Sequence, residues 1–247
     1  MWTYARIGKL EVSLPDRDRA VILKPHLHTN VQILFVTSGE RRVIVGTQEV
    51  VVCGGSSLII PGGVPHHALD DSRSSWSGLN LYVRPSLLPE LRPRVVVVDG
   101  DFAWTNHLRN HACLPIDLVG TVRSLIAQGR QIWVGEARAI PPDFDIVLPG
   151  EPLVRRETRI RRFKRLAGIA PGAHAQAIRL DRARHLLGGG HPPIDVAHAL
   201  NFADQSHLGR QFKAAFGTTP ARYAAAMIET SAAHRSQSFQ TEGATRK

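Results

Sequence analysis

Short runs of apolar and β-branched residues alternate with Gly, Ser and Pro over the first third of the chain. Six such runs fall between residues 20 and 85, and another lies at 95–98. Short, evenly spaced runs separated by turn-forming residues are typical of antiparallel strands. The pattern therefore predicts an antiparallel barrel or jelly roll in this part of the chain.

The apolar spacing becomes helical from about residue 117. A helix is predicted over 118–132, with Leu118, Val122, Leu125 and Ile126 on one face. That face either forms a dimer contact or packs on the barrel. Four prolines at 140–152 exclude a regular helix and predict a connector. Further helices are predicted at 156–167, 171–188, 193–200, 204–216 and 220–229, before a disordered tail at 230–247.

The stretch 193–223 has the pattern of two helices joined by a tight turn. Asn201 stands in the turn, where a left-handed backbone is expected, and Asp204 or Ser206 can cap the second helix. This is the pattern of a helix-turn-helix, whose second helix can lie in the major groove of DNA. The apolar residues predicted to form its core are Ala197, Phe202, Leu208, Phe212 and Phe216.

Polar side chains of the second helix fall off this apolar stripe. We expect four of them to face DNA bases, because they lie on the exposed side of the first turns: Gln205, Ser206, His207 and Arg210. Lys213, Arg179, Arg184 and Arg222 are predicted to contact phosphates. The alternative is an amphipathic helix with a solvated basic face.

The signature R-x-F-K-x3-G-x2-P occurs twice, at 161–171 and at 210–220. The repeat indicates that the helix-turn-helix unit is duplicated. The helix of the upstream copy is rich in arginine, and its predicted DNA-contacting residues are Arg156, Arg159, Arg161 and Arg162. Its first helix would fall in the proline-rich connector, where a regular helix is excluded. The upstream copy is therefore expected to contact phosphates only, or to present a solvated basic face.

Charge also differs between the first 150 residues, where strands are predicted, and the rest of the chain. Residues 1–150 carry 15 basic and 14 acidic side chains, whereas residues 151–247 carry 16 and 7. A nearly neutral half joined to a strongly basic half predicts a nucleic acid partner for the second. Cys53 and Cys113 fit no metal spacing and are expected to be buried thiols of a reducing compartment. With no signal peptide or membrane span recognised, a cytoplasmic location is expected.

Two histidine-containing motifs occur in the first half. The patterns are H-x-H-x3-Q-x6-G, from His26 to Gly39, and G-x5-P-x-G-x2-H-x3-D, from Gly55 to Asp70. They resemble the two motifs of the cupin fold, in which Gln32 stands where Glu is usual and Asp70 where Asn is usual. The resemblance implies that His26, His28 and His66 can hold a divalent transition metal, although no cofactor is required. The alternative is a metal-free effector pocket lined by His26, His28, Gln32, His66, Trp76 and Tyr82.

The basic half resembles the DNA-binding domain of the AraC/XylS family of bacterial transcription regulators. The matching segments are 161–171, 178–187 and 193–223. The resemblance implies an α+β protein with a cupin-like antiparallel β-barrel, followed by an all-α domain with two helix-turn-helix units. The expected divisions are a sensor at 1–100, a helical linker and dimerisation segment at 101–152, a DNA-binding domain at 153–229, and the tail.

The expected function is that of a sequence-specific transcription regulator that senses a small effector through its barrel, and not that of an enzyme. Its expected partners are double-stranded promoter DNA, a small-molecule effector and a second copy in a homodimer, with RNA polymerase as a further candidate and no membrane contact. The alternative hypothesis is a metal-dependent cupin enzyme with a basic nucleic-acid-binding appendage.

Overall fold

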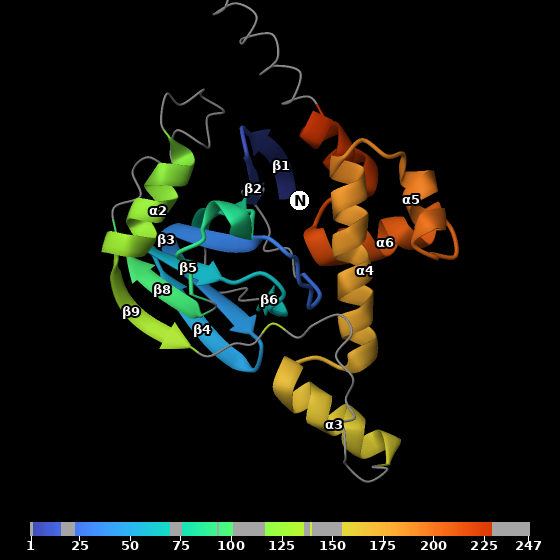
Figure 1. Ribbon diagram of the computed structural model, residues 1–247, viewed down its shortest axis with the longest axis horizontal. Helices are drawn as coiled ribbons and strands as arrows, with labels where there is room; N and C mark the ends of the chain where they lie inside the picture. The colour runs from blue at the N-terminus through green and yellow to red at the C-terminus, as the bar shows by residue number, and fades with distance from the viewer. Residues whose placement is uncertain are drawn as a thin grey trace, which may run out of the picture.

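The computed structural model describes residues 2–15, 23–69, 76–92, 94–100, 117–135, 139 and 155–228 of the 247-residue chain. Strands form one part of the molecule and helices the other (Figure 1). Helix α4 (Pro171–Gly188) runs along the boundary, and α2 (Leu118–Gln128) lies on the opposite side of the strands. The predicted order, an antiparallel β part followed by an all-α part, is confirmed.

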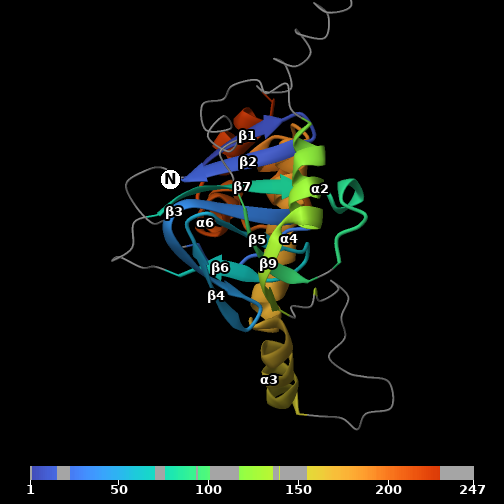
Figure 2. The same cartoon turned by 90° about the vertical axis from the view of Figure 1, so that its left-hand side faces the viewer.

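The strands are ordered β1-β2-β7-β3-β5-β8-β9, and β4 and β6 also pair with β3 (Figure 2). Every pairing among these strands is antiparallel. The bounds are β1 Trp2–Ile7, β2 Leu10–Pro15, β3 Val31–Val45, β4 Gln48–Cys53, β5 Ser56–Ile60, β6 His66–Ala68, β7 Trp76–Val83, β8 Val95–Asp99 and β9 Arg130–Gly135. A 3-10 turn, η1 (Pro85–Leu87), follows β7.

Strand β3 joins the two layers of the barrel. Two of the six predicted runs, at 31–39 and 41–46, form one continuous strand instead, which pairs first with β5 and β7 and then with β4 and β6. Its register shifts between Val36 and Ser38, and Gly39 adopts a φ of +72°. Glycine tolerates this left-handed backbone, so the strand bends there and crosses from one layer to the other without ending.

Alternate residues of the central strands enter two different apolar clusters. Leu34 and Leu58 face the barrel interior, whereas Ile33 and Ile59 face the outer side of the sheet. Burial on both faces explains why the sequence shows continuous apolar runs instead of clean alternation. The same periodicity places Gln32, two residues before Leu34, on the interior side.

Helix α2 covers the outer face of the sheet. Leu118 and Val122 are buried in the outer cluster, and Leu125 and Ile126 pack against it. The apolar face of this helix therefore packs on its own barrel, which decides between the two predicted roles. The predicted helix over 118–132 was too long, because residues 130–135 form β9 and pair with β8. Ladder hydrogen bonds to β8 satisfy the backbone of β9.

The helical part follows the predicted bounds closely: α3 Arg156–Ala167, α4, α5 Pro193–Ala199, α6 Gln205–Phe216 and helical residues 220–228. The sequence repeat is also a structural repeat. Gly168 and Gly217 end α3 and α6 with φ of +77° and +71°. Phe163 and Phe212 are buried at equivalent positions.

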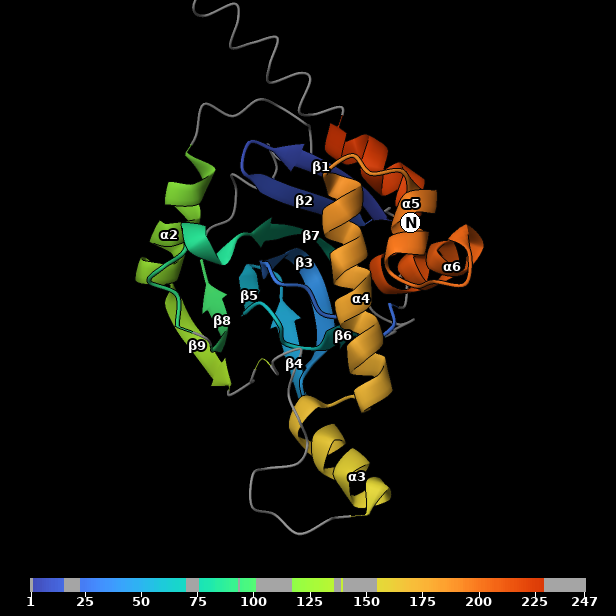
Figure 3. The ribbon, with the colours of Figure 1, turned by 45° about the vertical axis from the view of Figure 1, so that its right-hand side comes forward.

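Both repeat glycines touch the barrel. A Cβ on Gly217 would lie 2.0 Å from the indole of Trp2, and one on Gly168 would lie 1.9 Å from the carbonyl oxygen of Gly46. Trp2 and Tyr4 of β1 join the apolar core of the helical part. The Tyr4 hydroxyl donates to the Phe216 carbonyl at 2.9 Å. The two parts therefore share one continuous core along α4 and α6 (Figure 3).

Arg184 of α4 is buried where the two parts meet. Only 2% of its side chain is exposed, and its Nη2 lies 2.7 Å from Glu11 Oε1 of β2. Its guanidinium also stacks 4.4 Å from the ring centroid of Tyr82 in the barrel. The Tyr223 hydroxyl donates to the other Glu11 oxygen at 3.0 Å. A buried charge is tolerated because it is paired and stacked in this way.

Cys53 is exposed, contrary to the expectation of a buried thiol. It lies at the end of β4, where Val50 and Val52 point inward and the intervening residues point outward. Cys113, Asp70, the first helix of the upstream repeat and the tail lie outside the described residues. No helix in the described ranges is long and apolar enough to cross a lipid bilayer.

We predict that Arg184→Ala lowers the free energy of unfolding by about 3–5 kcal/mol, because it leaves the Glu11 carboxylate buried without its cation. Urea unfolding measures the loss. The matched control is Arg182→Ala on the exposed side of α4, which should change stability by less than about 0.5 kcal/mol. The double variant Glu11→Gln/Arg184→Ala should cost less than the sum of the two single changes, and an additive cost would contradict the pairing.

Candidate functional site

Helices α5 and α6 form a helix-turn-helix on the side of α4 away from the barrel (Figure 3). Asn201 in the turn has a φ of +54°, the left-handed conformation expected for it. Asp204 caps α6, since its Oδ1 accepts a hydrogen bond from the His207 amide at 2.5 Å. The predicted core residues Ala197, Phe202, Leu208, Phe212 and Phe216 are all buried, which confirms this part of the prediction.

The outward face of α6 carries the residues predicted to contact bases. Gln205, Ser206 and Arg210 are exposed at its N-terminal half, and Lys213 follows on the exposed side. His207 is half-buried: its ring packs 5.6 Å from the Phe202 ring, and its Nδ1 accepts from the Ala203 amide at 3.4 Å. His207 therefore also supports the turn, while its neighbours remain available to a partner.

Helix α3 presents a second basic surface. Arg156, Arg161 and Arg162 are exposed, whereas Arg159 is half-buried. Only Phe163 and Ala167 of this helix are buried, in a small cluster with Ile169. Since α3 buries so little, most of its arginines point to solvent. The surface suits a polyanion better than a base-specific contact.

Two residues predicted to contact phosphates do not lie on this surface. Arg184 is buried against Glu11, as described above. The Arg179 guanidinium donates to the Asn201 carbonyl at 3.2 Å and lies 4.6 Å from the Phe202 ring centroid. Arg179 of α4 therefore contacts and stabilises the turn of the helix-turn-helix. Helical spacing alone could not show which side of α4 faces the barrel. Arg222, also predicted to contact phosphates, is exposed.

The three motif histidines converge inside the barrel. His26, His28 and His66 are buried, and a ring nitrogen from each lies within 4.8 Å of the others. The Nδ1 atoms of the three rings lie 2.8–2.9 Å from the carbonyl oxygens of Lys24, Asn30 and Val64. An Nδ1–H that donates to a carbonyl leaves the Nε2 lone pair free, which is the tautomer of a metal-ligating histidine.

Gln32 completes the cluster. Its Oε1 lies 2.8 Å from His28 Nε2 and 2.9 Å from His66 Nε2. Its Nε2 donates to Asn80 Oδ1 at 2.8 Å, and the Asn80 amide donates to Ser13 Oγ at 3.2 Å. If the ring protons are on Nδ1, the Gln32 oxygen faces the Nε2 lone pairs of His28 and His66, an arrangement that a cation among them would stabilise.

The electrostatic environment favours neutral imidazoles. Burial, reinforced by the charge of neighbouring His66, lowers the pKa values of His26 and His28 well below their usual range. Burial also lowers the pKa of His66 to about 4. Neutral imidazole is the form that binds a metal ion.

The Gln32 oxygen lies close enough to two of the imidazoles for all three to share one ion. Two ligand atoms at right angles, each about 2.0–2.1 Å from an ion, lie about 2.9 Å apart. This is the spacing from Gln32 Oε1 to His28 and His66. His26, His28, His66 and Gln32 could therefore hold a divalent transition metal, which would supply positive charge to a small polar ligand.

The cavity beside this cluster is small. It measures about 40 Å³ and is lined by five of the predicted effector residues, namely His26, Gln32, His66, Trp76 and Tyr82. A water molecule needs roughly 10–15 Å³ measured in this way. The described cavity therefore has room for an ion and a little water, but not for a larger organic effector.

The helical part lies directly against the cluster. The Phe216 ring at the end of α6 stands edge-on to His26, with 5.6 Å between ring centroids. Thr29, next to His28, donates its amide to Asp181 Oδ2 of α4 at 3.0 Å. The Thr29 hydroxyl also lies 2.8 Å from His185 Nε2. The segment 26–29 therefore contacts the helix-turn-helix domain at both ends, through His26 and through Thr29.

Sequence reasoning missed the residues that support these sites. Asn80 orients Gln32, Glu11 pairs with Arg184, and Asp181 holds Thr29. Asn80 interrupts the apolar strand WSGLNLYV, and a polar residue at an inward position of a strand was a usable signal. Glu11 and Asp181 gave no such signal, because each pairs with a residue more than a hundred positions away.

Comparison with known families supports both parts. A model described as a helix-turn-helix domain matches residues 154–226, and one described as a cupin domain matches residues 19–74. The first match spans both copies of the repeat, and the second spans all three histidines of the cluster. The resemblances drawn from the sequence motifs are confirmed.

Known proteins similar to the chain include one from Bacillus subtilis and one from Vibrio cholerae. The Bacillus subtilis protein named uncharacterized HTH-type transcriptional regulator YbfI is 41% identical over 49 residues. These residues are 20% of this chain and 18% of that protein, so the match covers less than a fifth of the relative's length. A structure of ToxT from Vibrio cholerae is 11% identical, with a TM-score of 0.50, and covers 87% of this chain and 97% of that chain. This second likeness concerns the fold alone.

Proposed function

We propose that this chain, which joins a cupin domain to a helix-turn-helix domain of the AraC type, is a sequence-specific DNA-binding transcription regulator and not an enzyme. The observation that carries the proposal is the outward face of α6. A capped helix presents Gln205, Ser206 and Arg210 to solvent at the end that helix-turn-helix proteins place in the major groove.

The proposed DNA contacts are of two kinds, those to bases and those to phosphates. Arginine and glutamine form bidentate hydrogen bonds with guanine and adenine, so Arg210 and Gln205 are proposed to select bases. Lys213, Arg222 and the arginines of α3 are proposed to bind phosphates, in keeping with the excess positive charge of this half. Arg179 and Arg184 are not part of the proposed interface, because both are engaged within the protein.

We predict that Arg210→Ala weakens binding to the preferred site by about 1–3 kcal/mol and relaxes selection at one base pair. Lys213→Ala should weaken binding to all sequences alike and reduce the salt dependence. Fluorescence anisotropy, on DNA selected from a random library and on scrambled DNA at several salt concentrations, measures both effects. Arg84→Gln on the barrel surface is the control and should change neither. Equal affinity for selected and scrambled DNA at every salt concentration would refute sequence-specific regulation.

The proposed sensor is the histidine cluster of the barrel. Its contacts through Thr29 to Asp181 and through His26 to Phe216 connect it to the DNA-binding domain. We favour sensing over the metal-dependent enzyme, because the 40 Å³ cavity leaves little room for an organic substrate. A bound ion would favour the arrangement of the cluster that holds it, and with it the contacts of His26 and Thr29 with α6 and α4.

We predict that the metal-free protein takes up one Co²⁺ or Zn²⁺ ion per chain, since three Nε2 atoms and one amide oxygen converge. Cobalt absorbance and calorimetry measure uptake. His28→Ala and His66→Ala should abolish stoichiometric binding, and Gln32→Glu should strengthen it by adding an anionic ligand. His191→Ala, a change of an exposed histidine, should have no effect. Metal uptake that survives both cluster variants would place the ion elsewhere.

A homodimer, contact with RNA polymerase and a cytoplasmic location complete the proposal. The apolar face of α2 is already buried on its own sheet, so a dimer would use another surface. Size-exclusion chromatography with light scattering would give the oligomeric state.

A further inference from the structure

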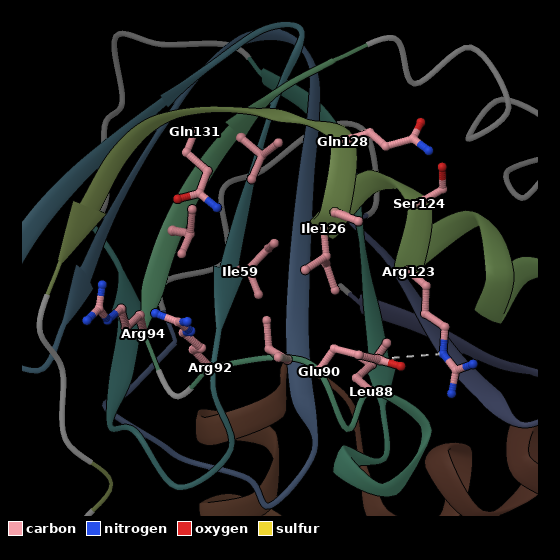
Figure 4. Close-up of a pocket in the computed structure, with 14 residues that line it drawn as sticks. Ile59, Leu88, Glu90, Arg92, Arg94, Arg123, Ser124, Ile126, Gln128 and Gln131 are labelled. Atoms are coloured by element: carbon pink, nitrogen blue, oxygen red, sulfur yellow. Dashed lines mark ion pairs between the residues drawn. The ribbon is translucent and has the colours of Figure 1, made fainter.

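A larger cavity lies on the outer side of the barrel, away from the helix-turn-helix. It measures about 570 Å³ and lies between α2, the strands β5, β8 and β9, and the segment that follows η1 (Figure 4). Small-molecule sites commonly measure about 300–1,000 Å³. This cavity is therefore large enough for an organic ligand, unlike the 40 Å³ cavity at the histidine cluster.

The floor and walls of the outer cavity are apolar. Ile59 and Val98 contribute from the sheet, Leu88 from the connecting segment and Ile126 from α2. Ile59 and Ile126 both point into the space between sheet and helix (Figure 4). Protein interiors are normally close-packed, so apolar surface left around a cavity of this size favours an apolar occupant.

The rim of the outer cavity is positively charged. Arg92 and Arg94 lie side by side at one end, and Arg123 lies at the other (Figure 4). Arg123 is close to Glu90, with 4.0 Å between Nε and Oε2, and its Nε donates to the Leu87 carbonyl. Within the described part of the chain, no acidic side chain pairs with Arg92 or Arg94. Two adjacent guanidinium groups beside an apolar wall suit a carboxylate or sulfonate with an apolar body.

We propose that this outer cavity is a second ligand site, which binds an amphipathic organic anion with its apolar body between α2 and the sheet and its acid group at Arg92 and Arg94. The ligand would bridge α2 to β5 and β8. The site is separate from the histidine cluster, and the proposal does not depend on DNA binding.

The probe is 8-anilinonaphthalene-1-sulfonate, whose fluorescence rises in an apolar site. N-phenyl-1-naphthylamine is the same molecule without its sulfonate and reports the apolar contribution alone. The full chain should bind the anionic probe more tightly than the neutral one, and dodecanoate should displace the anionic probe. Equal affinity for the two probes would overturn the role of the arginines.

The variant Arg92→Gln/Arg94→Gln should weaken the anionic probe by about tenfold and leave the neutral probe unchanged. Both positions are exposed, so the fold should be retained. The control Lys9→Gln/Arg182→Gln removes the same charge from exposed positions away from the cavity and should not alter either affinity. A loss of the same size in the control would show a non-specific charge effect and would refute the site.

Ala127→Phe tests the location of the site. Ala127 lines the cavity from the exposed side of α2, so a phenyl ring there should fill the space without disturbing the core. Both probes should lose binding while the melting temperature is retained. Unchanged probe binding would place the probes elsewhere and overturn the proposal. Light scattering that showed a dimer lost in this variant would instead make the cavity an interface between copies.

Discussion

The packing of α4 on the barrel depends on the buried ion pair between Arg184 and Glu11. Desolvating two charges is expensive, and their mutual attraction offsets that cost only when the pairing and hydrogen bonding are good. Here Arg184 also stacks on Tyr82, and Glu11 also accepts from Tyr223. Because Glu11 and Tyr82 belong to the barrel and Arg184 and Tyr223 to the helical part, this network exists only when the two parts are docked.

Because the two parts are docked, helices α4 and α6 of the DNA-binding part contact the histidine cluster of the barrel directly. Asp181, one turn from Arg184, holds the amide of Thr29 beside His28, and Phe216 of the helix-turn-helix unit packs on His26. A change in the histidine cluster therefore alters contacts made by α4 and α6. By linkage, if binding at the cluster changes the affinity for DNA by some factor, DNA binding changes the affinity at the cluster by the same factor.

The sequence predicted the helical part well, because caps, helix-ending glycines and the apolar stripe of α6 are local signals. It predicted the three histidines as one site, because their motifs resemble those of cupins. It did not predict that β3 is a single strand, or that residues 130–135 form a strand. Both depend on pairing with distant strands. Arg184 was misassigned to DNA because a basic residue on a helix has the same sequence pattern whether it faces solvent or a distant glutamate.

Hydrogen exchange at the Thr29 amide would show whether α4 holds the loop that carries His26 and His28. In the wild type this amide should be protected, since it donates to the buried Asp181 carboxylate. In Asp181→Asn, which keeps the shape but removes the charge, we expect exchange faster by about tenfold or more, with the Arg182→Ala control unchanged. Equally slow exchange in the wild type and in Asp181→Asn would contradict the claim that α4 couples the barrel site to the DNA-binding domain.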